Sequence, residues 1–228
     1  YAGLDMKGKT AVILVNDPGW DGDDPALFKG RAMTYYGRWT YKYEEAARRG
    51  AVGMLVVHET APASYGWATV KNSNTNTMFD IVRTHPAEDH TLIEGWIQHD
   101  VAIDLFRRAG LDFAALKKTA QTRDFKAVEL KGEGFSADYA VSSQVITSHN
   151  VVGRVEGAKR PNETVIYSAH WDHLGIGAPD ARGDRINNGA VDNATGTAAL
   201  IEMGRAFADG KRPDRSVVFL AVTAEEKG

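Results

Sequence analysis

Three short clusters of histidine and acidic residues punctuate the last part of the sequence. They read TVIYSAHWDHLG (residues 164–175), NNGAVDNATGTAAL (187–200) and SVVFLAVTAEEKG (216–228). The first and third clusters begin with apolar, β-branched runs, which are typical of buried strands in a parallel sheet. Between them, residues 195–210 place apolar side chains at helical spacing, and Gly210 suits the position just after a helix. The pattern predicts a strand, a helix and a second, parallel strand.

Polar side chains follow both predicted strands. His170 and Asp172 come directly after the first strand, and Asp192 stands just before the helix. Glu225 and Glu226 follow the second strand. Because sites in open α/β sheets lie outside the carboxyl ends of the strands, we expect one imidazole and four carboxylates to meet at one rim. This combination predicts a metal site.

The residue types favour zinc or a neighbouring divalent ion. Imidazole and carboxylate groups suit such ions, and the sequence has no cysteine that could supply a thiolate. His170 is the natural nitrogen ligand, and Asp172 is placed to accept the other ring N–H. Asp192 can offer its two oxygens to two metals. Of the adjacent glutamates, one can bind metal while the other stays free as a general base.

In this order the clusters resemble those of the co-catalytic di-zinc aminopeptidases, which include bacterial leucyl aminopeptidases, glutamate carboxypeptidase II and the transferrin receptor. That family has His-x-Asp after one strand, a Gly-Ala-x-Asp-Asn-Ala-Ser/Thr-Gly turn, and Glu-Glu after another strand. The three motifs occur here as His170-Trp171-Asp172, Gly189 to Gly196 and Glu225-Glu226. The resemblance implies a three-layer α/β/α zinc-exopeptidase domain with a cis peptide bond after Asp192.

The resemblance also assigns roles. It implies that His170 binds one of two zinc ions, Asp192 bridges both, and Glu226 binds the other. Glu225 is then the general base, and Asp172 orients His170. The family has two further ligands, an Asp and a His, without counterparts in the printed sequence. We therefore expect this sequence to be an internal piece of a longer protein, inactive by itself.

The first part of the sequence predicts a second α/β domain. We expect strands at 11–16, 51–57 and 92–98, helices at 39–49 and after Asp100 and Asp112, a polar loop at 58–89, and strand-like segments at 125–130 and 139–155. DMKGKTAVILVNDPG (5–19) and YEEAARRGAVGMLVVHE (43–59) resemble, in this order, the protease-associated domain that many secreted di-zinc aminopeptidases carry. The expected domains are a protease-associated domain at 1–133 and the zinc-peptidase catalytic domain at 134–228, each lacking part of its sequence.

Composition excludes some partners. A net charge of −3 gives no reason to expect a nucleic acid or an anionic membrane as partner, and no apolar run approaches the length of a membrane span. Without cysteine there are no disulfides. The sequence contains no signal peptide, and a periplasmic or secreted location is expected from the resemblance alone.

The expected function is a zinc-dependent exopeptidase, with an aminopeptidase favoured, that uses a two-metal-activated water on peptide substrates. Carboxypeptidase or glutaminyl-cyclase chemistry on the same scaffold stays open, as does a non-catalytic binding role of the transferrin-receptor type. Scattered single histidines are expected in loops or on the surface: His58, His85, His90, His99 and His149. His173 could touch substrate, but a supporting or merely structural role is favoured.

Overall fold

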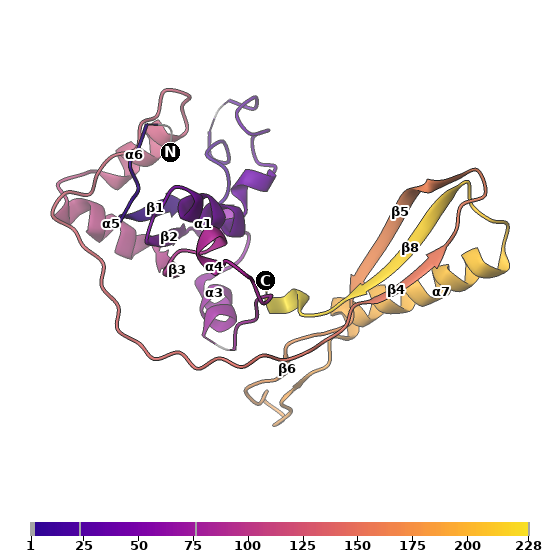
Figure 1. The fold of residues 1–228 in the computed structure, drawn as a ribbon. Helices are drawn as coiled ribbons and strands as arrows, with labels where there is room; N and C mark the ends of the chain where they lie inside the picture. Colours follow the sequence, from indigo (N-terminus) through magenta and orange to yellow (C-terminus); the bar gives the residue numbers. More distant parts are fainter. Residues whose placement is uncertain (1–2, 23, 76, 228) are drawn as a thin grey trace. The chain divides into compact units, whose positions relative to one another are not determined.

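The computed structural model describes residues 3–22, 24–75 and 77–227, with only the main chain described at 86, 87 and 227 (Figure 1). The chain divides into two compact units, the first formed by residues 1–76 and 83–141 and the second by residues 77–82 and 142–228. Both combine strands with helices, which confirms the predicted α/β class. The assignment of residues 1–133 to a protease-associated domain stays a prediction.

The first unit is built on a parallel sheet with the strand order β1-β2-β3. These strands are β1 (Thr10–Leu14), β2 (Gly53–His58) and β3 (Ile93–Gln98). All six residues of the central strand β2 are buried. Met54 packs with Ala46 of α1 (Trp39–Arg48), whereas Val57 packs with residues of α5 (His99–Arg108) and α6 (Phe113–Ala120). Val56 packs with Val15 and Ala63, so side chains of β2 enter three apolar clusters.

Two helix starts in this unit were predicted from aspartates, with different outcomes. Asp112 caps α6, where its Oδ1 accepts a hydrogen bond from the Ala115 N–H at 3.0 Å. Asp100 instead lies within the first turn of α5, and Gln98 occupies the cap position. The prediction for Asp100 is wrong because the helix begins at His99, one residue before the aspartate.

The predicted polar loop at 58–89 is wrong in part. It contains α2 (Thr60–Ala63), α3 (Trp67–Asn74) and α4 (Pro86–Asp89). These helices are short and lack an apolar stripe, so the sequence carries no helical period to detect. A single 3-10 turn, η1 (Tyr35–Gly37), precedes α1.

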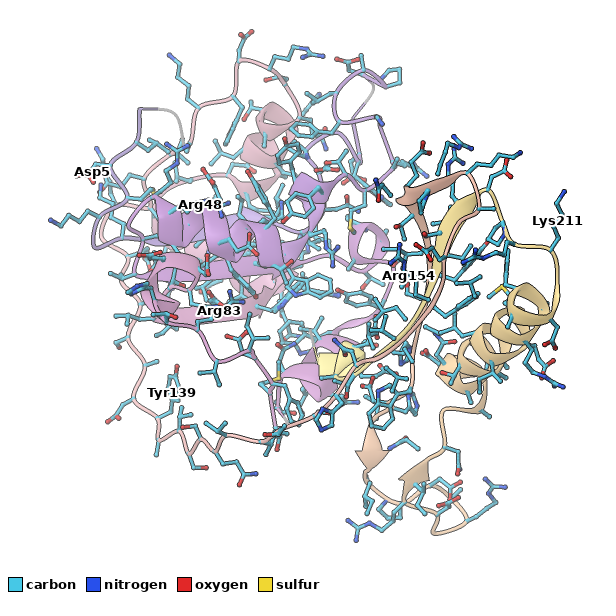
Figure 2. All side chains as sticks on the ribbon, turned by 45° about the vertical axis from the view of Figure 1, so that its right-hand side comes forward. Asp5, Arg48, Arg83, Tyr139, Arg154 and Lys211 are labelled. Carbon is cyan, nitrogen blue, oxygen red and sulfur yellow. The ribbon has the colours of Figure 1, made fainter. Side chains whose placement is uncertain are left out.

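The strand-like segments at 125–130 and 139–150 form no strand. Tyr139 lies on this irregular segment and is 62% exposed (Figure 2). Only the end of the predicted segment is a strand, β4 (Val151–Val155). Apolar and β-branched residues favour strands, but they form one only where a partner strand is available.

The second unit contains the predicted strand–helix–strand unit. β5 (Arg160–His170) and β8 (Arg215–Val222) are parallel, α7 (Thr195–Asp209) connects them, and β4 pairs with β8 in the antiparallel direction. The remaining elements are the hairpin β6 (Gly175–Ile176) with β7 (Ile186–Asn187), the turn η2 (Ala190–Ala194) and the final turn η3 (Glu225–Lys227).

Helix α7 supplies one side of this unit's core. Leu200 packs with Ala169 of β5 and with Val217 and Phe219 of β8, and Met203 and Phe207 join them. Other apolar side chains of the same sheet are exposed, such as Ile166 at 60%. Within the described residues, no helix has both the length and the apolarity to cross a membrane.

Gly210 lies directly after α7, as predicted. Its backbone is extended, with φ −92° and ψ −170°, rather than left-handed. A Cβ at this position would lie 2.6 Å from the carbonyl oxygen of Ala206. Glycine is therefore needed for close approach to the last turn and not for a positive φ.

Candidate metal centre

The parallel pairing of β5 and β8 brings the predicted site residues to one edge. His170, the last residue of β5, is opposite Val222, the last residue of β8. The segments that follow the two strands therefore leave the sheet on the same side. Asp192 lies in η2, immediately before α7 joins this edge. The topology predicted from sequence is what gathers these side chains.

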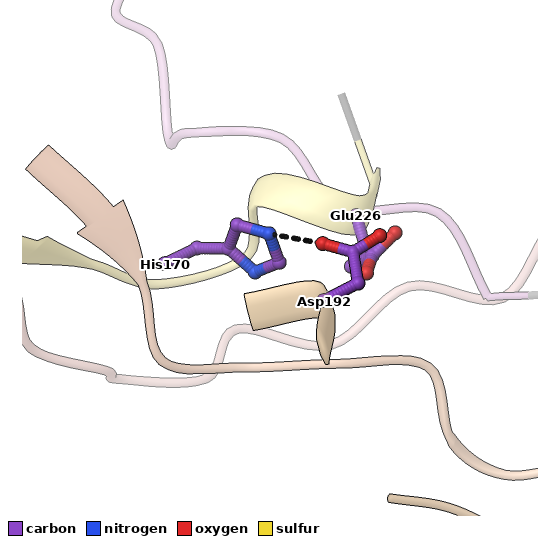
Figure 3. Close-up of side chains that lie close together, drawn as sticks. All are labelled: His170, Asp192 and Glu226. Carbon is purple, nitrogen blue, oxygen red and sulfur yellow. Dashed lines mark hydrogen bonds and ion pairs between the residues drawn. The ribbon is translucent and has the colours of Figure 1, made fainter. Parts of the chain in front are cut away.

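His170, Asp192 and Glu226 form a cluster of possible metal ligands (Figure 3). One ligand atom from each residue lies within 4.8 Å of the others. The His170 Nε2 is 2.9 Å from the Asp192 Oδ1. In the part of the chain that the structure describes, no other group of three such residues meets this criterion. The donor set is one nitrogen and two carboxylates, which fits zinc.

Both nitrogens of the His170 ring have polar partners, the Asp172 carbonyl at Nδ1 and the Asp192 carboxylate at Nε2. Its Nδ1 lies 2.9 Å from the main-chain carbonyl oxygen of Asp172, so this nitrogen carries the hydrogen and donates it. The Asp172 carboxylate is farther away, at 3.9 Å. The orienting contact that was expected from this carboxylate is thus made by the main chain of the same residue. The Thr197 hydroxyl of α7 donates to the His170 carbonyl oxygen at 3.0 Å.

The surroundings of His170 raise the pKa of its imidazole. Burial alone acts to lower this pKa, but the hydrogen bonds to the Asp172 carbonyl and the Asp192 carboxylate, with the negative charge of Glu225, outweigh it. These contacts favour positive charge at this position. A bound cation would satisfy the same carboxylates without the proton.

Glu225 lies at the rim without joining the three-residue cluster. Its Oε2 is 3.7 Å from the His170 Nε2, and its side chain is 56% exposed. Its main-chain N–H points to the Asp172 Oδ1 at 3.4 Å. The adjacent glutamates therefore differ in setting, since the Glu226 side chain is only 17% exposed.

The turn that carries Asp192 is shaped by its neighbours. The Asp192–Asn193 peptide bond is cis, as the resemblance implied. The Asn193 Oδ1 accepts a hydrogen bond from the Gly196 N–H at 3.0 Å, in the manner of a helix cap. A Cβ on Gly196 would lie 2.1 Å from that oxygen, so the close contact requires glycine.

His173 is the site residue that sequence reasoning left in a minor role. Its Nδ1 is 2.5 Å from the Glu226 Oε1. The only sequence signal was its position on the same loop, three residues after His170. A hollow of about 280 Å³ adjoins this loop and is lined by Trp171, His173, Asn188, Ala194, Thr197 and Ile201, among others.

Within the described part of the chain, histidine is the only basic partner of the site's carboxylates. Among the described side chains, no lysine or arginine pairs with Asp172, Asp192, Glu225 or Glu226. Several carboxylates gathered without a countercharge repel one another. A divalent cation is the natural complement of such a group.

Most of the other histidines are outside this site, and the prediction for one of them is wrong. His58 is not in a loop or on the surface: it is the last residue of β2 and only 4% exposed. Its Nε2 lies 3.0 Å from the Tyr65 carbonyl oxygen, and its ring contacts Tyr65, Trp67 and Trp96. These aromatic neighbours, which come from outside the strand, explain its burial.

Comparison with known proteins agrees with the site. The profile of Peptidase family M28 matches residues 150–228, which include all the predicted site residues. A probable zinc metalloprotease of Pyricularia oryzae is 31% identical over 120 residues, which is 46% of this chain and 23% of that protein. Aminopeptidase NAALADL1 of Mus musculus is 37% identical over 90 residues, 36% of this chain and 10% of that protein.

A probable zinc metalloprotease of Pyrenophora teres f. teres is 36% identical over 78 residues, 34% of this chain and 16% of that protein. The chain thus matches less than a quarter of the length of each of these relatives. The predicted kinship with zinc peptidases is confirmed by the family match and by the relatives together. Residues 150–228, which contain the cluster of His170, Asp192 and Glu226, are similar to Peptidase family M28.

Proposed function

We propose that this chain is part of a zinc-dependent exopeptidase that removes amino-terminal residues from peptides. The observation that carries the proposal is the ligand cluster of His170, Asp192 and Glu226 at the carboxyl edge of β5 and β8. The names of two groups of relatives, zinc metalloprotease and aminopeptidase, support the same chemistry.

His170, Asp192 and Glu226 would hold the metal. With the Nδ1 hydrogen donated to the Asp172 carbonyl, a neutral His170 presents the lone pair of Nε2 as a ligand. The Asp192 side chain is 68% exposed, so its second oxygen is accessible to a second ion, as the bridging role requires. Bound zinc supplies a Lewis acid that polarises the scissile carbonyl and lowers the pKa of a water.

Glu225 is proposed as the general base. It lies beside the cluster, 3.7 Å from the His170 Nε2, yet its carboxylate is exposed and outside the ligand set. It is therefore free to take a proton from the attacking water and to return it to the leaving amine. Asp172 holds the His170 ring through its carbonyl and approaches the Glu225 N–H through its carboxylate.

The test uses the full-length protein with a set of chromogenic substrates. We expect zinc-dependent turnover of an aminoacyl p-nitroanilide with a free α-amine and none of its N-acetylated analogue. A chelator should abolish the turnover and added zinc should restore it. His170→Ala should remove activity, whereas His85→Ala, which changes an exposed histidine of the other unit, should not.

The same set distinguishes the alternatives. Cleavage from the carboxyl end of a peptide, or cyclisation of an amino-terminal glutamine, with no aminoacyl turnover would overturn the aminopeptidase assignment. Zinc binding without turnover of any of these substrates would indicate a binding protein instead.

A further inference from the structure

We infer that His173 is a positioning residue of the metal centre: it donates its Nδ1 hydrogen to Glu226 and fixes that carboxylate in the site. The inference rests on the proposed function, because it takes Glu226 as a metal ligand. It adds a residue that the metalloprotease resemblance does not assign.

The contact itself is short and polarised. The His173 Nδ1 and the Glu226 Oε1 are 2.5 Å apart, and the two side chains are only 22% and 17% exposed. An ionised carboxylate only accepts hydrogen bonds, so the hydrogen belongs to Nδ1. Hydrogen bonds to a charged acceptor are shorter and stronger than neutral ones. A carboxylate has two oxygens, so one can accept from His173 while the other binds a metal.

This contact joins two segments that are distant in sequence. His173 lies on the loop after β5, and Glu226 lies in η3 after β8, 53 positions away. Among the described residues it is the only hydrogen bond or ion pair of the Glu226 side chain. Glutamate has several rotatable bonds, whose freedom must be lost when it binds a metal. His173 removes part of that freedom beforehand.

Gly189 provides the space for the His173 ring. Its φ is +63°, and a Cβ there would lie 2.9 Å from both the Cβ and the Cγ of His173. The same Cβ would lie 2.7 Å from the carbonyl oxygen of Asp192. Because Gly189 has no side chain, the turn that carries Asp192 leaves room for the His173 ring to reach Glu226. The turn of one candidate ligand, Asp192, is therefore in contact with the residue that supports the other, Glu226.

The test compares two substitutions of one residue in the full-length protein. His173→Ala removes the donor, whereas His173→Asn keeps an N–H at nearly the position of Nδ1. Zinc affinity is measured by competition with a chromophoric chelator, and thermal unfolding of the metal-free protein checks that each variant is folded. The matched control is His85→Ala, which removes an exposed histidine of the first unit.

We expect His173→Ala to weaken zinc binding by about 10- to 100-fold, the usual effect of losing a group that supports a metal ligand. His173→Asn should recover most of the affinity, and His85→Ala should leave it unchanged. An affinity of His173→Ala within about twofold of the parent would overturn the inference. The inference would also be overturned if His173→Asn bound zinc as weakly as His173→Ala while both metal-free variants were equally stable. The loss of zinc affinity would then come from the packing of the ring and not from its hydrogen bond.

Glu226→Gln separates this inference from the metal centre on which it rests. If Glu226→Gln weakens zinc binding and His173→Ala does not, the metal centre stands and the positioning role is wrong. If the unaltered protein binds no zinc, or binds it independently of Glu226, the proposed metal centre is wrong and the role of His173 fails with it.

Discussion

The two units treat the charged rim of a parallel sheet in opposite ways. Beyond β2 and β3 of the first unit, the Lys117 Nζ lies 2.7 Å from the Asp21 Oδ2 and 2.7 Å from the Glu59 Oε1. These residues line a hollow of about 620 Å³. Beyond β5 and β8 of the second unit, carboxylates gather with histidine as their only described counterpart. The first rim carries its own cation, and the second is complementary to a cation from outside.

The two sheets also differ in how many residues of a strand are buried. All six residues of β2 are buried, whereas only Ala169 and His170 are buried among the 11 residues of β5. Those two residues lie at the carboxyl end of β5, where the amino-terminal turns of α7 cover them. The first unit thus buries its central strand completely, whereas β5 of the second unit is buried only beneath the candidate site.

The largest expected effect is on catalysis at the rim beyond β5 and β8. In the full-length protein, Glu225→Gln should lower kcat by roughly 10²- to 10⁴-fold and leave the zinc content near normal, because it removes only proton transfer. Glu226→Gln should lose zinc as well as activity. Zinc content by elemental analysis and steady-state rates check both. Equal zinc loss in the two variants would mean that the roles of the glutamates are wrongly assigned.

The difference in burial predicts unequal costs for truncating side chains in the two sheets. Met54→Ala should lower the free energy of unfolding by about 2–5 kcal/mol, because Met54 is fully buried in the first unit. Ile166→Ala should change it by no more than about 0.5 kcal/mol, because Ile166 is 60% exposed. Urea denaturation of the chain measures both. A cost for Ile166→Ala comparable with that of Met54→Ala would show that β5 is covered in solution.

The first unit also contains one buried lysine among its described residues, Lys42, which predicts a dependence of stability on pH. Lys42 is 7% exposed, and its Nζ donates to the Asn16 carbonyl oxygen at 2.9 Å. Burial lowers the pKa of Lys42 to about 8, although the charge of Asp17 acts in the opposite direction. Between that value and the ordinary lysine pKa of 10.5, the unfolded chain binds more protons than the folded chain.

The contribution of Lys42 to stability should therefore rise with pH in this window, by at most about 1.4 kcal/mol per pH unit. Below the folded pKa both states are protonated, and the contribution is constant. The difference in unfolding free energy between the parent and Lys42→Met, measured from about pH 7 to pH 10, isolates this contribution. A difference that falls with pH would show that the lysine is not desolvated.

The smallest expected effects are changes in the unfolding free energy of the metal-free protein when one charge is removed from each rim. Lys117→Met should cost about 1 kcal/mol, because it leaves Asp21 and Glu59 without their shared cation at a partly exposed site. Asp192→Asn should cost less than about 0.5 kcal/mol or be slightly stabilising, because it removes one of several like charges. Chemical denaturation near pH 8 with a chelator present measures both. A larger cost for Asp192→Asn than for Lys117→Met would contradict the difference between the rims.

The sequence was sufficient to predict the parallel strands of the second unit and the gathering of the candidate ligands at one edge. Two apolar runs with a helix between them dictate parallel strands, and parallel strands end at one edge. The topology therefore predicted that His170, Asp192 and the two glutamates meet, and the family resemblance selected Glu226 over Glu225 as the ligand. The predicted parallel pairing is confirmed by the register of His170 with Val222.

The contacts between side chains could not be predicted in this way. His173 and Glu226 are 53 positions apart, and their contact depends on rotamers and on the space left by Gly189. Likewise, the partner of the His170 ring is the Asp172 carbonyl rather than its carboxylate, a choice set by the path of the loop. The strand prediction for residues 139–150 was wrong for another reason. Val141 and Val145 favour a strand locally, but no strand pairs with them.

The central claim is that the carboxyl edge of β5 and β8 is a zinc site, and anomalous scattering at the zinc edge tests it most directly. Crystals of the full-length protein grown with zinc should show an anomalous peak bonded to the His170 Nε2 and to the carboxylates of Asp192 and Glu226, at about 2.0–2.2 Å. His170→Ala crystals should lose or weaken this peak. A zinc peak elsewhere, with the His170 Nε2 still hydrogen-bonded to Asp192, would contradict the claim.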